Sequence, residues 1–282
     1  MRNEEDILEI SNINTFDILF EDEYYIAIYK PAKLLVHRSS IDRHETQFVL
    51  QILRDQIGQY IYPIHRLDKP TSGVLLFAKS SDAAHLCQQL IQQQAITKEY
   101  LAIVRGHPTS CFIAHSVKAQ KDKYHQKELL PDSIKKAETT LQLLATTEID
   151  NHIDARYPFS RYALVALQPH TGRRHQLRYH MKHIASPIIG DPKYGKAPHN
   201  RYFAAQLNYN RLYLTASLLM FIHPFTQNKI TIKGQADHHF QQAATLCGFN
   251  SVLNHYFEHD QPAIRPKDAS LIHHKHNKIE AS

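Results

Sequence analysis

Residues 64–80, IHRLDKPTSGVLLFAKS, place a charged turn between two apolar segments. The segment that leads into the turn, QYIYPI, and the segment that leaves it, VLLFA, have the composition and length of strands. The cluster KPTSG cannot continue either strand, so a strand–turn–strand unit is predicted with Asp68 in its turn. Loops held by rigid strands are where functional side chains are usually placed. The alternative is a surface turn in which Asp68 only caps its own backbone.

The composition indicates a protein of the reducing interior of the cell. The chain has 282 residues, 43% of them hydrophobic, and no apolar run is long enough to span a bilayer. Its first residues, MRNEEDILEI, are acidic, and no apolar signal segment follows them. The three cysteines lie far apart and form no CxxC pair, which argues against a disulfide framework. We therefore expect a cytoplasmic protein with no membrane association, of one large or two small domains.

The balance of charge and the scarcity of glycine are both informative. A net charge of +6, with 21 histidines not counted, indicates a polyanionic partner if the charge is clustered. The chain has eight glycines, and we expect those near the motifs described below to need unusual backbone angles or a close approach of another segment. These positions are Gly73, Gly172, Gly190 and Gly195.

The periodicity of apolar residues predicts the main elements. One helix is expected at 46–58, ending at Gly58, and another at 81–95, with Ser81 as its N-cap and Cys87 buried in its core face. Strands outnumber helices, and several follow one another without a helical crossover. This pattern favours an α+β fold on a mixed, mainly antiparallel sheet flanked by helices and loops. A last helix is predicted at about 237–249, and strands within 16–39 and at 59–64, 74–78, 96–106, 162–169, 211–224 and 229–233.

The elements are predicted to form one domain over residues 16–250, after a loose acidic leader at 1–15. Residues 107–136 are irregular and rich in charge and histidine, so we expect an exposed insertion there. Residues 251–282 are polar and are expected to be a disordered tail.

The most basic stretch, HTGRRHQLRYHMKHI at 170–184, is predicted to be a helix that starts at Thr171-Gly172. At about 100° per residue, Leu177, Met181 and Ile184 share one face. Arg178 lies in the adjoining basic stripe, where it can be partly buried and would need an acidic partner. The helix N-terminus, with its nearby arginines, is a ready anion site. The alternative is a solvated basic face. The stripe consists of Arg174, Arg178 and Lys182, with Arg173 beside it.

Several known sites can be set aside. The histidines of the basic stretch point to different sides of a helix, and no HExxH motif joins them, so zinc binding is disfavoured. A kinase catalytic loop needs asparagine where Gly73 stands, and a retaining glycosidase needs two close carboxylates where this turn supplies one. The chain has no Walker loop, GxGxxG or GxSxG motif. The residues alone thus indicate a basic nucleic-acid binder with a candidate acidic site.

Four motifs carry a family resemblance: HRLDKPTSGVLLFAK, KEYLAIVRG, TGRRHQLRYHM and PIIGDPKYG. Together and in this order they resemble the RluA family of RNA pseudouridine synthases, over about residues 16–233. The segments LLVHRSSIDRHE and YPFSRYALVALQPHTGRRHQLRYH resemble most the branch that modifies uridine 65 of tRNA. The resemblance implies a single catalytic domain with a central cleft, which acts as a monomer on tRNA. No additional N-terminal RNA-binding domain is expected before residue 16.

The resemblance also assigns roles to individual residues. Asp68 would be the catalytic aspartate, and Arg66 in the same turn would enter the space left by the extruded nucleotide. Tyr100 in KEYLA would stack on the uracil, although an ordinary strand tyrosine is the alternative. Arg178 would pair with Asp68 and keep it ionised in a pocket that loses water. The remaining substrate-binding residues implied are His65, Arg173, Arg174, Lys182 and Leu214, with Arg38 and Arg43 as weaker candidates for phosphate contacts.

One position departs from the family pattern. Thr215 follows Leu214 in LYLTA, where the family often has histidine. The departure weakens the assignment of this motif and of Leu214, but it leaves the aspartate unaffected.

The implied reaction explains why one carboxylate suffices. The bond from N1 of uracil to the ribose breaks, the base turns, and C5 is bonded instead, so the reaction needs no metal or cofactor. Asp68 could attack C1′, add to C6 or take a proton from C2′, and the sequence leaves these paths open. A base inside a helical stem must flip out first. The alternatives are another uridine of tRNA or 23S rRNA, an inactive RNA-binding protein, and a DNA-binding module, for which no helix-turn-helix or zinc pattern exists.

Overall fold

The computed structural model describes residues 13–37, 46–118, 134–154 and 157–259, together with residues 262 and 264. These residues form two compact units. The first unit comprises the described chain up to Thr97 and Thr215–Gln235, and the second comprises Lys98–Leu214 and the described chain from Ala236. The second unit extends past residue 250, the predicted end of the single domain, because it includes residues up to 264. No helix in these described ranges is long and apolar enough to cross a membrane.

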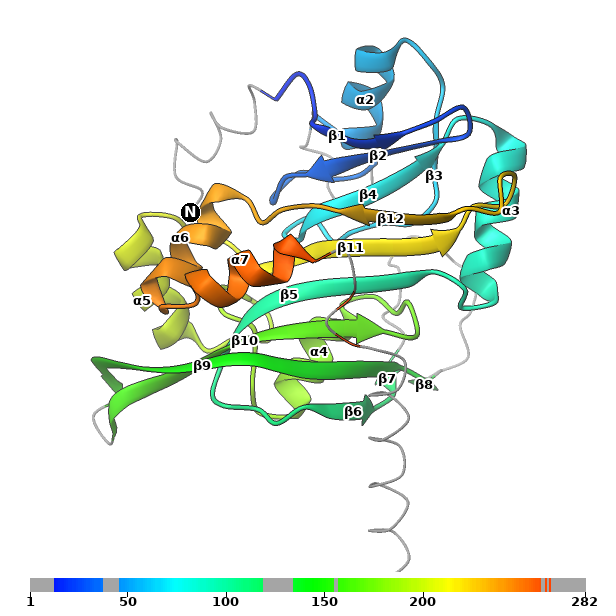
Figure 1. Cartoon of the computed structure of the whole chain (residues 1–282). Helices are drawn as coiled ribbons and strands as arrows, with labels where there is room; N and C mark the ends of the chain where they lie inside the picture. Colours follow the sequence, from blue (N-terminus) through cyan, green and yellow to red (C-terminus); the bar gives the residue numbers. More distant parts are fainter. Residues whose placement is uncertain are drawn as a thin grey trace, which may run out of the picture. The chain divides into compact units, whose positions relative to one another are not determined.

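The sheet of the first unit is mixed (Figure 1). Its strand order is β1-β2-β4-β11, with β3 paired to β4 and β12 paired to β11. β11 runs parallel to β4, whereas β1, β3 and β12 each pair antiparallel with their neighbours. The strands are β1 (Ile18–Glu21), β2 (Tyr25–Lys30), β3 (Tyr62–Pro63), β4 (Ser72–Ala78), β11 (Leu214–Ile222) and β12 (Lys229–Lys233).

The helices of this unit confirm the sequence prediction closely. α2 (Val49–Ile57) ends at Gly58, which adopts a left-handed conformation with φ of 65°. α3 (Ser81–Gln92) begins one residue earlier than predicted, because the N-cap is Ser80, whose hydroxyl accepts the Ala83 N–H at 3.1 Å. Cys87 is fully buried in the core of the unit, as predicted.

The sheet of the second unit is antiparallel, in the order β5-β10-β9-β6. Its longest strand, β9 (Glu138–Asp154), was not predicted, because its threonines and glutamates lack a clear alternation. β6 (Cys111–Ala114) corrects the expectation of an irregular insertion at 107–136, since Phe112 and Ile113 are buried there. The other strands are β5 (Thr97–Arg105), β10 (Tyr157–Pro169), and the pair β7 (Val117–Lys118) and β8 (Ile134–Lys135).

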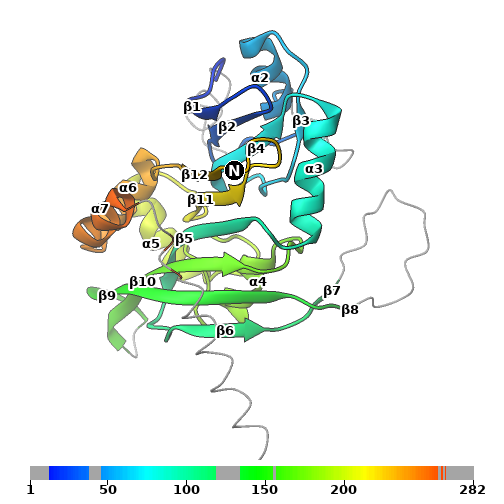
Figure 2. The ribbon, with the colours of Figure 1, turned by 45° about the vertical axis from the view of Figure 1, so that its right-hand side comes forward.

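Helices cover both faces of this second sheet (Figures 1 and 2). α5 (Ala197–Leu207), α6 (His238–Leu246) and α7 (Asn250–Glu258) pack on the face that carries Leu101 and Ile103 of β5. α4 (Gln176–His183) packs on the opposite face, with Ala102 and Val104. The period-two alternation along β5 therefore separates the two cores.

α7 corrects the prediction of a polar tail from residue 251. Leu253 and Tyr256 are buried and pack with β5, so helical spacing of a few apolar side chains sufficed to order this segment. The tail beyond residue 264, the leader up to residue 12, and Arg38 and Arg43 lie outside the described residues. The α+β class and the mixed, mainly antiparallel pairing are confirmed. The central cleft stays a prediction.

Candidate active site

Asp68 lies in the turn between β3 and β4, as predicted. The Thr71 N–H donates to the Asp68 carbonyl oxygen at 3.0 Å, which closes the turn. Leu67 is buried and anchors the turn to the unit, while Asp68 itself is half-buried and Arg66 is exposed. The Nε2 atom of His65 accepts the Leu76 N–H at 3.3 Å, so His65 supports the turn from the side of β4.

A buried lysine holds the far side of the same turn. Lys30, the last residue of β2, is fully buried, and its ammonium donates to the carbonyl oxygens of Pro31 at 2.7 Å and Leu34 at 2.8 Å. A further bond of 3.2 Å reaches the carbonyl oxygen of Lys69, the residue after Asp68. A buried cation requires such acceptors, so the backbone next to Asp68 is fixed by charge-assisted bonds that sequence reasoning missed.

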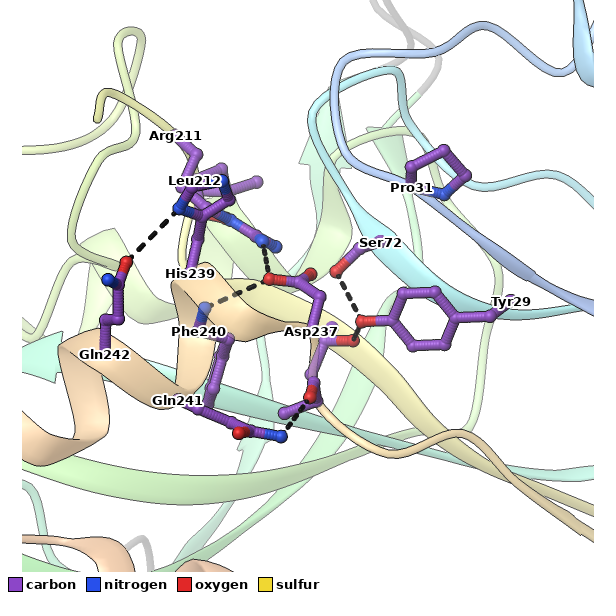
Figure 3. A network of polar contacts seen from close by, with 12 residues as sticks. Tyr29, Pro31, Ser72, Arg211, Leu212, Asp237, His239, Phe240, Gln241 and Gln242 are labelled. Carbon is purple, nitrogen blue, oxygen red and sulfur yellow. Dashed lines mark hydrogen bonds and ion pairs between the residues drawn. The ribbon is translucent and has the colours of Figure 1, made fainter. Parts of the chain in front are cut away.

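A hydroxyl cluster occupies the position that departs from the family pattern. The Tyr29 hydroxyl lies 3.3 Å from the Ser72 hydroxyl (Figure 3) and 3.2 Å from the hydroxyl of Thr215, which is fully buried. Ser72 and Thr215 are also register partners in the parallel β4–β11 pair. Thr215 thus joins β2, β4 and β11 through side-chain bonds that suit a small hydroxyl.

In the second unit, the basic segment begins as a loop and becomes helical at Gln176 rather than at Thr171. The reason is His175, which takes a left-handed conformation with φ of 57°, a conformation few non-glycine residues adopt. Buried Gln176 closes the loop, because its Oε1 accepts from the Thr171 hydroxyl at 2.7 Å and from the Arg173 N–H at 3.1 Å. Its amide nitrogen donates to the Glu138 carbonyl oxygen at 2.9 Å.

The apolar face of α4 is as predicted, and the acidic partner of Arg178 is Asp191. Leu177 and Met181 are buried in the core, and Ile184 packs against it. Arg178 Nε lies 2.7 Å from Asp191 Oδ2, and Arg178 Nη2 lies 2.8 Å from Asp191 Oδ1. Asp191 lies in the PIIGDPKYG motif, and the sequence alone predicted no separate role for it. The pairing of Arg178 with Asp68 stays a prediction.

Asp191 is ionised in the interior. Burial alone would raise the pKa of this carboxyl, but the hydrogen bonds and charge of Arg178 outweigh that cost and hold the pKa below its ordinary value. The N–H groups of Tyr194, at 3.0 Å, and Lys193, at 2.9 Å, act in the same direction.

Tyr100 and Leu214 pack in the same core as α4. Tyr100 is half-buried on β5, opposite Leu167 of β10, and Leu214 is buried at the start of β11. The second unit therefore brings together Tyr100, Leu214 and the helix that carries Arg178.

The predicted phosphate-binding side chains are exposed near α4. Arg173, whose Nε donates to the Lys136 carbonyl oxygen at 3.1 Å, and Arg174 precede the helix. Lys182 is exposed near its end, with Nζ 6.0 Å from the centre of the Tyr194 ring. Lys193, which sequence reasoning did not single out, brings its Nζ within 5.3 Å of the same ring.

The histidines of the basic segment bind protein groups. His180 is buried, with Nδ1 2.9 Å from the Thr139 hydroxyl and Nε2 2.8 Å from the His115 carbonyl oxygen. His170 contacts the Thr140 hydroxyl at 2.8 Å, and His175 the Tyr194 hydroxyl at 3.3 Å. Among the described residues, no group of three or more His, Cys, Asp or Glu is arranged to hold a metal ion.

Comparison with known proteins identifies the family. Residues 24–183 match the family described as RNA pseudouridylate synthase. The chain belongs to this family. The matched range of this synthase family holds the Asp68 turn, Tyr100 and Arg178, and the resemblance of the motifs to the RluA family is confirmed.

Curated relatives of the synthase are similar over nearly their whole length. The tRNA pseudouridine synthase C of Pasteurella multocida (strain Pm70) is 50% identical over 225 residues, which cover 79% of this chain and 92% of the relative. The protein of the same name from Haemophilus influenzae (strain ATCC 51907 / DSM 11121 / KW20 / Rd) is 46% identical over 238 residues, covering 84% and 99%.

Solved structures support the synthase fold. The human protein named RNA Pseudouridylate Synthase Domain Containing 4 superposes with a TM-score of 0.61 at 24% identity, covering 85% of this chain and 95% of that chain. Human RNA Pseudouridylate Synthase Domain Containing 1 gives 0.61 at 21% identity, covering 86% and 89%.

Proposed function

We propose that this synthase isomerises a single uridine of tRNA, uridine 65, to pseudouridine, with Asp68 as the catalytic carboxylate. The identity of 50% to a relative named tRNA pseudouridine synthase C, over 92% of that relative, carries the choice of tRNA. The motif resemblance supplies the position. Asp68 is chosen because it is a half-buried carboxylate in a turn that Lys30, His65 and Leu67 hold in place.

Each step of the reaction has a candidate side chain. The glycosidic bond between N1 and C1′ breaks, C5 is bonded to C1′, the proton at C5 is lost to solvent and N1 takes up a proton, so the substrate and product are isomers. Asp68 acts on the ribose or the base as nucleophile or base. Tyr100 stacks on the flipped uracil, a contact worth roughly 1–3 kcal/mol, and Leu214 packs beside it.

Cationic side chains contact the RNA and keep Asp68 ionised. Arg66, which is exposed in the Asp68 turn, fills the gap left by the flipped base, since a guanidinium stacks on bases and bonds phosphates. Arg178 keeps Asp68 ionised while the site loses water. Arg173, Arg174 and Lys182 contact phosphates, and His65, which accepts the Leu76 N–H, binds the substrate beside the Asp68 turn.

The test is release of tritium from tRNA labelled at C5 of uridine, because isomerisation must expel that hydrogen. We expect the wild type to release about one equivalent per tRNA, and a tRNA with cytidine at position 65 to release none. Asp68→Asn should bind tRNA but release nothing. Asp82→Asn, at an exposed aspartate in the first turn of α3, is the matched control and should keep the wild-type rate.

Other outcomes would contradict specific parts of the proposal. Full release from the tRNA that lacks uridine 65 would refute the position. Release from 23S rRNA and none from tRNA would refute the substrate. Activity of Asp68→Asn at the wild-type rate would refute the catalytic role, and tRNA binding by the wild type without release from either RNA would favour an inactive RNA-binding protein.

A further inference from the structure

We propose that Asp191 is a positioning residue for catalysis, which fixes the orientation of the Arg178 guanidinium. The inference rests on the proposed function, since that function gives Arg178 its role. It concerns a carboxylate in the PIIGDPKYG segment to which the motif comparison assigns nothing.

The geometry of the pair determines the direction of the guanidinium. Asp191 binds Arg178 side-on, through Nε at 2.7 Å and Nη2 at 2.8 Å. Two parallel bonds to one planar carboxylate fix both the position and the plane of the planar guanidinium. Asp191 takes two of the five N–H bonds of the group, and the other three face away from its carboxylate. Without Asp191, rotation about the long side chain would spread these donors over many directions.

Further hydrogen bonds hold Asp191 in place, so its carboxylate keeps one position and can orient Arg178. Its Oδ1 atom also accepts the N–H groups of Lys193 and Tyr194. The side-chain amide of Asn200 spans the backbone around Asp191: its Oδ1 accepts the Gly190 N–H at 2.8 Å, and its Nδ2 donates to the Asp191 carbonyl oxygen at 2.9 Å.

Two glycines allow this packing. A Cβ on Gly190, where φ is 77°, would overlap the backbone of Arg211, and a Cβ on Gly195 would overlap the Asp191 carbonyl oxygen. The loop that carries Asp191 therefore packs more closely than it could with a side chain at residue 190 or 195.

Burial makes the ion pair between Arg178 and Asp191 hard to replace. The side chains of Arg178 and Asp191 are 5% and 0% exposed, so water cannot replace either partner. The Arg178 guanidinium carbon also lies 5.4 Å from the centre of the Tyr194 ring, a third contact from the same loop. A pair used only for stability could be placed anywhere in the core, whereas this one sits on the arginine that the proposed reaction uses.

The second unit provides a matched control in another buried arginine. Arg211 forms an ion pair with Asp237, whose carboxylate also accepts the Phe240 N–H at 3.0 Å and caps α6 (Figure 3). The Arg211 side chain is 1% exposed. Asp237→Asn thus disrupts a comparable ion pair in the same unit at residues that the proposed reaction does not use.

The experiment measures single-turnover tritium release and tRNA affinity for Asp191→Asn, Arg178→Lys, the double variant and Asp237→Asn. We expect Asp191→Asn to slow release by about tenfold or more while tRNA affinity stays within about twofold. In the Arg178→Lys background, Asp191→Asn should slow release no further, because its effect passes through Arg178. Asp237→Asn should lower the melting temperature yet keep the rate within about twofold.

A wild-type rate for Asp191→Asn would overturn the proposal, and so would an equal further loss in the Arg178→Lys background. If Asp191→Asn does not fold, Asn200→Ser loosens the support of Asp191 and keeps its charge. That variant should slow release in the wild-type background and leave Arg178→Lys unaffected. Equal slowing in both backgrounds would again overturn the proposal.

A second readout is independent of turnover and of the substrate. The Nε–H nuclear magnetic resonance signal of Arg178 should be sharp and slow to exchange in the wild type and in Asp237→Asn. In Asp191→Asn it should be lost or averaged. An unchanged signal in Asp191→Asn would refute the positioning role even if the proposed substrate were wrong, whereas failure of the wild type to act on tRNA would refute only the proposed function.

Discussion

Gly73 of β4 and Ala216 of β11 are register partners in the parallel pair, and their backbones touch. A Cβ added to Gly73 would overlap the backbone nitrogen and carbonyl oxygen of Ala216. Gly73 also has φ of 110°, a conformation that side chains rarely permit. The strand that follows the Asp68 turn therefore joins β11 only because residue 73 has no side chain.

Gly73→Ala should destabilise the protein severely. Overlap with a backbone atom and positive φ together predict a loss of roughly 2–5 kcal/mol in the free energy of unfolding, measured by urea denaturation. Gly172→Ala is the control, because a Cβ there meets nothing within 4 Å. It should change stability by less than about 0.5 kcal/mol. Equal stability of the two variants would contradict the close approach.

Lys30→Met should loosen the Asp68 turn. Methionine retains most of the volume but leaves one buried and two partly buried carbonyl oxygens without the ammonium, so we expect a loss of roughly 2–5 kcal/mol in stability. The rate of tritium release should fall by about tenfold or more, because the carboxylate is no longer held in place. Lys79→Met, which removes a partly exposed ion pair with Glu21 in the same unit, should leave the rate unchanged. A wild-type rate for Lys30→Met would show that the turn is rigid without the lysine.

His180→Gln should remove part of the pH dependence of stability. Burial lowers the pKa of His180, although its bond to the His115 carbonyl oxygen opposes the shift and the nearby His115 and His183 rings add to it. The unfolded chain then binds more protons than the folded chain below about pH 6.5, so stability falls as the pH drops from there toward the lowered pKa. Urea denaturation between about pH 7 and 5 should show a smaller loss for His180→Gln than for the wild type.

His115 contributes in the same direction, since burial and His183 also lower its pKa. His180→Gln should therefore reduce the slope of stability against pH rather than abolish it. At about pH 7 the variant itself should be roughly 1–3 kcal/mol less stable, because glutamine cannot make both bonds of the imidazole well. Parallel curves for the two proteins would show that His180 binds protons equally in the folded and unfolded chains, which would contradict the lowered pKa.

Arg174→Ala should weaken tRNA binding mainly through counterion release. Arg174 is exposed before α4, and loss of one phosphate contact should reduce the slope of log affinity against log salt by about one unit. Lys229→Ala, at an exposed position on β12, should leave the slope unchanged. Titrations between roughly 50 and 200 mM salt measure both slopes. The same slope for Arg174→Ala and wild type would remove Arg174 from the phosphate contacts.

Short-range sequence patterns predicted much of the fold. The end of α2 at Gly58, the buried face of α3 around Cys87, and the Asp68 turn all follow from residues within a few positions of one another. The errors have local causes too: α4 begins late because His175 is left-handed, and β9 was missed because its polar residues lack a clear alternation. Propensity and periodicity depend on residues that are close in sequence, so they predicted these local features.

By itself, the sequence determined the family, the α+β class and the turn that carries Asp68, because these depend on ordered motifs and short-range patterns. Only the tertiary structure decided that Arg178 pairs with Asp191 and that the ammonium of Lys30 reaches the backbone of the Asp68 turn. A buried charge must find a partner, but its own neighbourhood in sequence does not say which one. The partner is whichever group the folded chain brings within hydrogen-bond distance.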